Sequence, residues 1–132
     1  MTEKDTIKKS STKTASDRGR SARRRGADFE RKIAASLRES GIDVNARRGQ
    51  QYCGKVEGNA DVTTNCGLHI EAKYVARLNL RDAYEQSCHD AKQESEFTGS
   101  RKIPVVVHGM ARKETLVTLS WEAFLEIYKS YT

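Results

Sequence analysis

Apolar and polar residues alternate along residues 68–75, near the middle of the chain. The run begins Leu68, His69, Ile70, Glu71, Ala72, Lys73. A period of two is typical of a β-strand with one face in the core, so it predicts that Glu71 and Lys73 share the polar face. The short turn Asn65-Cys66-Gly67 predicts an antiparallel hairpin with an earlier strand over about residues 60–65.

Helical periodicity predicts three helices around this hairpin. The first should run over residues 27–40, with Gly41 as its left-handed stop. The second should start after a cap at Asn79 and end at the Thr98-Gly99-Ser100 break. The third should follow Ser120.

Further strands are predicted over residues 42–46, 103–107 and 115–119. The middle one is a continuous apolar run, which is typical of a strand buried on both faces. The resulting order is αβββαββα, an α/β fold of α+β character with a mixed β-sheet flanked by helices. The aromatic and β-branched residues of 103–128 fit either a dimer surface or the core.

Charge divides the chain into two regions. Residues 1–25 hold nine Lys and Arg against three acidic residues, while the rest of the chain holds fifteen of each sign, so the first 25 residues account for the net charge of +6. Their polar composition predicts a disordered basic arm before one domain over residues 26–132. The arm ends in Arg23, Arg24 and Arg25, a cluster suited to phosphate, and a solubilising tail is the simpler alternative.

Composition also bounds location and redox chemistry. No apolar run is long enough to span a membrane and no hydrophobic signal region follows the basic start, so we expect a soluble cytoplasmic protein without a membrane partner. Three cysteines without CxxC spacing make a disulfide framework a poor fit. Cys66 with His69, and Cys88 with His89, allow a zinc site, but half-buried thiols and a histidine beside the site are favoured.

The loop over residues 47–55 is polar and flanked by glycines. Gly49 and Gly54-Lys55 fit the spacing of a nucleotide-binding loop, but Val56 stands where Ser or Thr would bind Mg²⁺, so we expect no nucleotide cofactor. The loop suits a nucleic-acid backbone instead. Its candidate nucleic-acid-binding residues are Arg47, Arg48, Gln50, Gln51 and Lys55.

Asp61 precedes Glu71 by ten residues and can bring a second carboxylate to the polar face. Two carboxylates suit Mg²⁺, with Mn²⁺ as a substitute, and Lys73 could orient or deprotonate an attacking water. The simpler alternative is a surface ion pair between Glu71 and Lys73. Glu30 lies on the inward stripe of the first helix, either favoured there by the helix dipole or aimed at the site. Gln86 lies at the edge of the second helix's apolar stripe, within reach of a cleft.

These residues resemble the PD-(D/E)xK nuclease superfamily, and the element order is similar to that of archaeal-type Holliday junction resolvases. Several stretches further resemble small phage and prophage proteins described as Holliday junction resolvases. They are residues 47–54, 61–62, 69–73, 78–80, Gln86 and residues 104–107. The resemblance covers about residues 26–130 and leaves the arm outside.

The resemblance implies a restriction-endonuclease-like core and, if a phage encodes the chain, a location in the host cytoplasm. It also implies roles for individual residues. The implied metal ligands are Asp61, Glu71 and the backbone carbonyl of Ala72. Lys73 would be the catalytic lysine, Glu30 would complete the metal environment through water, and Gln86 would act near the lysine or the DNA. One departure is Ala60, which stands where the family has a proline that only shapes the backbone.

The sequence therefore predicts a Mg²⁺-dependent endodeoxyribonuclease that hydrolyses phosphodiester bonds in branched DNA, above all in four-way junctions. We expect a homodimer, because two symmetric strands must be cut in concert. Two alternatives remain open. One is another nicking or restriction-like endonuclease of the same superfamily, and the other is a non-catalytic basic nucleic-acid-binding module.

Overall fold

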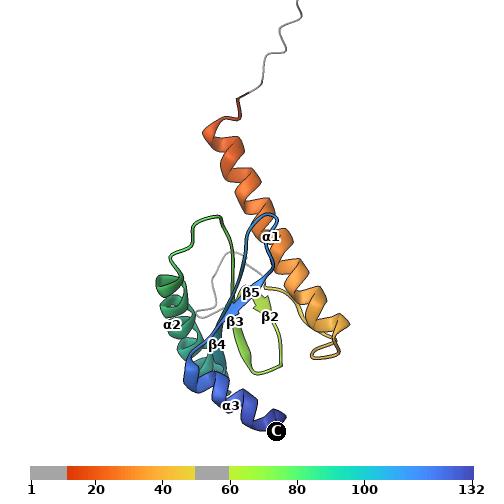
Figure 1. Ribbon diagram of the computed structural model, residues 1–132, viewed down its shortest axis with the longest axis vertical. Coiled ribbons are helices and arrows are strands. Elements are labelled where there is room, and N and C mark those ends of the chain that lie inside the picture. The colour runs from red at the N-terminus through yellow and green to blue at the C-terminus, as the bar shows by residue number, and fades with distance from the viewer. Residues whose placement is uncertain (1–11, 50–59) are drawn as a thin grey trace, which may run out of the picture.

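The computed structural model describes residues 12–49 and 60–132, which fold into a mixed α/β arrangement (Figure 1). The elements are α1 (Ala15–Glu39), β1 (Arg47–Arg48), β2 (Val62–Thr63), β3 (Leu68–Tyr74), α2 (Leu80–Thr98), β4 (Ile103–Gly109), β5 (Leu116–Thr118) and α3 (Trp121–Tyr131). This order confirms the predicted αβββαββα fold class. Among the described residues, no helix is both long and apolar enough to cross a membrane.

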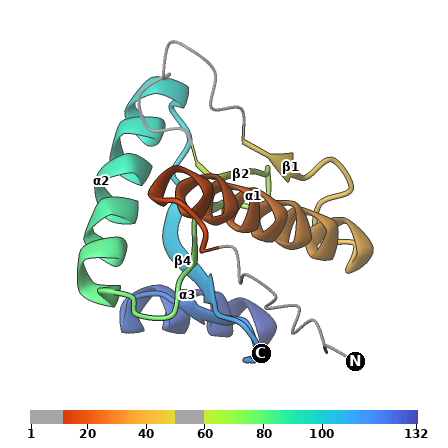
Figure 2. The same ribbon diagram turned by 90° about the horizontal axis from the view of Figure 1, so that it is seen from above.

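A single sheet has the spatial order β1-β2-β3-β4-β5, with β3 at its centre. β3 pairs antiparallel with β2, as predicted for the hairpin, and parallel with β4. Parallel neighbours need a crossover connection, and α2 supplies it. α1 and α2 lie on opposite faces of the sheet (Figure 2), so both faces of β3 are covered.

The apolar side of β3 packs against α1. Phe29 and Ile33 of α1 form one buried cluster with Ile70 of β3 and Val105 of β4. Burying each large apolar side chain stabilises the fold by about 1.5–3 kcal/mol. On β4, Val105 and its neighbour Val106 are 1% and 0% exposed while pointing to opposite faces, as predicted for a strand buried on both sides.

Helix α1 begins much earlier than the apolar pattern predicts. The hydroxyl of Thr14 accepts a hydrogen bond from the Asp17 backbone N–H at 3.2 Å, and the Asp17 carboxylate accepts one from the Thr14 backbone N–H at 3.3 Å. This capping box starts the helix at Ala15, so the predicted start near Ala27 is wrong, as is the prediction of disorder for residues 15–25. The first turns of α1 extend past the sheet (Figure 1).

The strand predicted over residues 42–46 is also wrong. The Asp43 carboxylate accepts hydrogen bonds from the backbone N–H groups of Asn65 and Asn45, at 2.8 and 2.9 Å, and from the Thr64 hydroxyl at 2.8 Å. These bonds, that from Asn65 foremost, hold the pKa of Asp43 below its usual value. A short side chain that binds nearby backbone groups competes with strand pairing, which begins only at β1.

Helix α3 has the predicted apolar stripe, and most of that stripe is exposed. Trp121, Phe124 and Tyr128 are 66%, 42% and 51% exposed, and only Ala123 of this helix is buried. The Trp121 and Phe124 rings stack with centroids 5.6 Å apart, and the Phe124 and Tyr128 rings with centroids 5.8 Å apart. These aromatic side chains therefore lie outside the core of the described residues, and their use as a dimer surface stays a prediction.

Candidate active site

The residue before β2 and the polar face of β3 bring two acids and a lysine together. The Asp61 backbone N–H donates to the Ile70 carbonyl at 3.1 Å, and the Asp61 carboxylate accepts a hydrogen bond from the Ala72 backbone N–H at 2.8 Å. Oε1 of Glu71 lies 3.3 Å from Nζ of Lys73. The hairpin register thus places Asp61 at the same end of β3 as Glu71 and Lys73.

Apolar packing and one glycine hold Asp61 in place. Val62 lies opposite Ile70 in the register, and the two side chains are 0% and 2% exposed. A slip by one residue would turn Val62 out of the core, so burial pins the register. On the other side, the Gly49 backbone N–H donates to the Asp61 carbonyl at 2.8 Å. A Cβ atom at Gly49 would lie 2.2 Å from the Ala60 carbonyl oxygen, so only glycine permits this approach.

The carboxylate of Glu71 is buried and that of Asp61 is half-buried, and the pKa of each is raised. Burial, followed by the charge of Asp61, raises the pKa of Glu71 to about 7 against the opposing effect of Lys73. Burial also raises the pKa of Asp61, against the Ala72 hydrogen bond and the charge of Lys73. A bound cation would offset both the repulsion and the lost hydration. This set of oxygen donors therefore fits a hard divalent cation such as Mg²⁺.

Glu30 reaches the same region from α1. Its side chain is buried, and its Oε2 accepts a hydrogen bond from Nε of Arg48 at 2.6 Å. Burial raises the pKa of Glu30, the Arg48 hydrogen bond lowers it, and the charge of Asp61 raises it further. Glu30 therefore lies within electrostatic range of the site, and Arg48, expected on nucleic acid, forms an ion pair with it.

The remaining candidate nucleic-acid-binding residues divide into two groups. Exposed positions on α1 and β1 carry Arg23, Arg24, Arg25 and Arg47. Gln50, Gln51 and Lys55 lie outside the described residues. These four arginines are exposed to solvent, where a DNA phosphate could reach them. Their role in binding nucleic acid stays a prediction.

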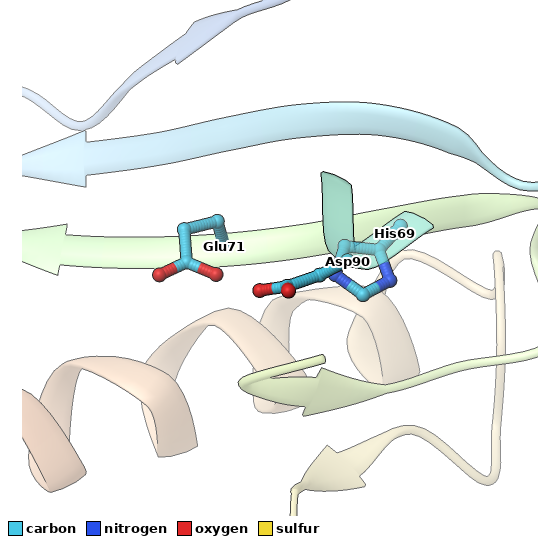
Figure 3. Close-up of side chains that lie close together, drawn as sticks. All are labelled: His69, Glu71 and Asp90. Atoms are coloured by element: carbon cyan, nitrogen blue, oxygen red, sulfur yellow. The ribbon is translucent and has the colours of Figure 1, made fainter. Parts of the chain in front are cut away.

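Helix α2 adds an acid that the sequence pattern did not single out. The exposed Gln86 donates from Nε2 to both carboxylate oxygens of Asp90, at 3.0 Å each. One ligand atom each from His69, Glu71 and Asp90 lie within 4.8 Å of one another (Figure 3). Asp90 follows Gln86 by four residues, so extending the helix edge that carries Gln86 by one turn finds it.

The cysteine and histidine pairs do not assemble the alternative zinc site. His69 is 0% exposed, and its Nδ1 binds Oε2 of Glu94 at 2.5 Å. Cys66 and Cys88 are half-buried free thiols, as favoured from sequence. Within residues 12–49 and 60–132, no cysteine joins a group of potential metal ligands.

No protein-family model, curated protein or solved structure matches this chain. Its chemistry must therefore be argued from the side chains themselves. The buried carboxylate of Glu71 and the half-buried carboxylate of Asp61 can hold a divalent cation, and the half-exposed Lys73, 3.3 Å from Glu71, presents an amine beside it.

Proposed function

We propose that this protein is a Mg²⁺-dependent endonuclease that hydrolyses phosphodiester bonds in branched DNA, above all in four-way junctions. The observation that carries the proposal is the meeting of Asp61, Glu71 and Lys73 at the β2–β3 hairpin. The resemblance of these residues to the PD-(D/E)xK superfamily supports it, as does the αβββαββα order.

Each residue has a proposed role. Asp61, Glu71 and the carbonyl of Ala72 would hold Mg²⁺, or Mn²⁺ in its place. Such an ion, when bound, offsets charge on the phosphate and lowers the pKa of water. Lys73 lies 3.3 Å from Glu71, where its amine can orient the attacking water or accept its proton. Glu30 would position water at the site from α1.

Positive charge on α1 and β1 would hold the DNA backbone. The exposed Arg23–Arg25 cluster and Arg47 supply side chains for phosphate, joined in the proposal by Gln50, Gln51 and Lys55. Gln86, which binds Asp90, would orient that acid near the lysine or the DNA. Cutting a junction symmetrically requires two sites, so we propose a homodimer, and the exposed aromatic stripe of α3 is an apolar surface available for it.

A synthetic four-way junction incubated with Mg²⁺ tests the proposal. The parent protein should make paired, symmetric nicks. Lys73→Ala should slow cutting by about 10²–10⁴-fold, the usual effect of losing a catalytic acid–base group, and Asp61→Asn, which removes a proposed metal ligand, should slow it by at least as much. Asp28→Asn and Lys113→Ala change exposed residues of the same types and should cut at the parental rate.

Three outcomes would overturn parts of this proposal. A folded parent that binds junctions but never cuts them would indicate a basic binding module, whose affinity falls steeply with salt and is unchanged by Asp61→Asn. Equal cutting of junctions and linear duplexes would indicate another endonuclease of the superfamily. Parental rates in both Asp61→Asn and Lys73→Ala would remove the catalytic assignment.

A further inference from the structure

We propose that His69, Glu71 and Asp90 form a histidine-containing site for a divalent transition-metal ion, such as Mn²⁺ or Co²⁺. One ligand atom from each residue lies within 4.8 Å of the other two (Figure 3). The site shares Glu71 with the proposed Mg²⁺ site and takes its other ligands from β3 and α2 instead of Asp61. Its existence does not depend on nuclease activity.

The first argument is an unsatisfied nitrogen. The His69 side chain is 0% exposed, and its Nε2 has no hydrogen-bond partner among residues 12–49 and 60–132. A buried polar atom left without a partner costs about 1–3 kcal/mol. A metal ion between His69 and the two carboxylates would give this nitrogen a partner, because neutral imidazole is a common metal ligand.

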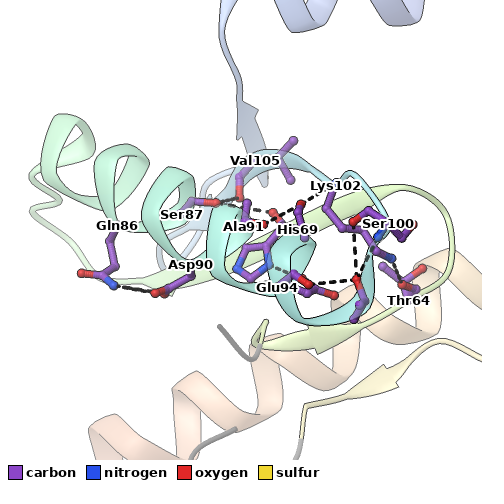
Figure 4. Close-up of polar contacts among 12 residues, drawn as sticks. Thr64, His69, Gln86, Ser87, Asp90, Ala91, Glu94, Ser100, Lys102 and Val105 are labelled. Atoms are coloured by element: carbon purple, nitrogen blue, oxygen red, sulfur yellow. Dashed lines mark hydrogen bonds and ion pairs between the residues drawn. The ribbon is translucent and has the colours of Figure 1, made fainter. Parts of the chain in front are cut away.

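The second argument is the orientation of the ring. Nδ1 of His69 lies 2.5 Å from Oε2 of Glu94, on the side of the ring opposite Asp90 (Figure 4). In neutral imidazole, an Nδ1–H donated to Glu94 leaves the lone pair on Nε2. Metal-binding histidines are usually fixed in this way, with the second nitrogen donating to a carboxylate. Glu94 is thus a positioning residue, and Nε2 is the ligand.

The third argument is that α2 is fixed where the site needs it. The Ser87 hydroxyl, 0% exposed, donates to the carbonyls of His69 and Val105, at 3.4 and 3.2 Å. Nε2 of Gln86 donates to both oxygens of Asp90 (Figure 4). The helix is therefore joined to β3 and β4 beside the site, and the Asp90 carboxylate is held in one orientation.

The donor set also indicates the kind of ion. Mg²⁺ prefers oxygen ligands and keeps several waters. One imidazole with two carboxylates suits the first-row transition metals better, because nitrogen binds them more strongly than it binds Mg²⁺. We therefore expect Co²⁺ and Mn²⁺ to bind at this site more tightly than Mg²⁺.

The test is calorimetric titration of the full chain with Co²⁺ and with Mg²⁺, accompanied by the visible absorption of bound Co²⁺. The parent should bind Co²⁺ more tightly than Mg²⁺. Asp90→Asn removes a half-buried ligand, and Glu94→Gln weakens the support of the ring. Glu94→Gln should lower Co²⁺ affinity by about 10–100-fold, the range found for partners of metal ligands, and Asp90→Asn should lower it by at least as much. His89→Gln changes an exposed histidine next to Asp90 and should leave the titration unchanged.

His69→Gln is the direct test, and circular dichroism shows whether it folds. A folded variant should lose the Co²⁺ absorption band. The proposal is overturned if the parent binds no Co²⁺, if both Asp90→Asn and Glu94→Gln bind it like the parent, or if His89→Gln loses it. Junction cutting is a separate measurement, since Lys73→Ala should slow cutting by about 10²–10⁴-fold and keep Co²⁺ binding. A parent that binds Co²⁺ through His69 without cutting junctions would refute the proposed nuclease and sustain this site.

Discussion

The two faces of β3 both carry buried residues, and those residues are chemically opposite. Ile70 faces α1 and is 2% exposed, while His69 and Glu71 face α2 and are 0% and 8% exposed. On the α1 face, removing apolar surface from water stabilises the fold. On the α2 face, carboxylates are kept partly from water, which raises the pKa of Glu71. One strand therefore contributes stability on one side and holds a destabilising charge cluster on the other.

This difference separates residues whose burial stabilises the fold from residues whose burial destabilises it. A charge held away from water without a full set of partners destabilises a fold, and such groups concentrate at functional sites. The α2 face of β3 meets that description, and the α1 face does not. Substitutions on the two faces should therefore change stability in opposite directions.

The largest effect is expected on the apolar face. Ile70→Ala removes a side chain at the centre of the cluster between α1 and the sheet, and should lower the free energy of unfolding by about 2–5 kcal/mol. Val117→Ala is the matched control on β5, because Val117 is 58% exposed and should change stability by less than about 0.5 kcal/mol. Urea unfolding followed by circular dichroism measures both. Equal losses would show that the α1 face is not the principal core.

Substitution of Glu71 should raise the free energy of unfolding of the metal-free protein. The pKa of this group is about 7 in the fold, against an ordinary value of 4.5, so the folded chain binds the proton more tightly. That stabilisation is complete below about pH 4.5 and is lost as the pH rises through 7. Glu71→Gln carries no charge, so at pH 8 it should exceed the parent in stability by about 2–3 kcal/mol.

Urea unfolding of Glu71→Gln and the parent at several pH values, with a chelator present, checks this expectation. The two stability curves should converge near pH 4.5. A parent that becomes more stable between pH 5 and 8 relative to Glu71→Gln would contradict the assignment of Glu71 as a destabilising charge.

The smallest expected effect is a change in the pKa of Glu71 when its ion-pair partner Lys73 is replaced. The charge of Lys73 lowers the pKa of Glu71, so Lys73→Met should raise that pKa above 7. The Lys73 side chain is 39% exposed, and solvent screening should keep the change below about one unit. Carbon-detected NMR titration of the Glu71 carboxyl measures it directly. A fall in this pKa would mean that the lysine does not act on Glu71.

The sequence predicted the elements whose patterns are local. Alternation over β3, the glycine turn before it and the apolar run of β4 each gave the correct element, because one face or both faces of these strands are buried. The first helix was placed correctly over its buried stripe and missed over residues 15–25, where a capping box replaces apolar packing. The failure at residues 42–46 has a similar cause, since Asp43 binds Asn65 from across the chain.

The part of the site that depends on local pattern was predicted, and the part that depends on contacts between distant segments was not. Glu71 and Lys73 share a strand face, and one hairpin register brings Asp61 to them. Helical spacing from Gln86 points to Asp90, but its position beside Glu71 depends on the crossover that lays α2 on β3 and β4. The periodicity of α3 shows that it is amphipathic without specifying what covers it, and the described chain leaves its aromatic side chains exposed.

Because α1 is continuous, it fixes the distance between its exposed arginines and the candidate site. Arg23, Arg25 and Glu30 lie on one uninterrupted helix, so no loop conformation enters the distance between them. At about 1.5 Å per residue, the arginines precede Glu30 by about 8–10 Å along the axis. A DNA strand advances about 3.4 Å per nucleotide, so that interval corresponds to about two or three nucleotides. If DNA phosphates bind these arginines, the length of α1 between them and Glu30 sets the distance along the DNA strand from the bound phosphate to the carboxylates. That distance does not depend on base sequence.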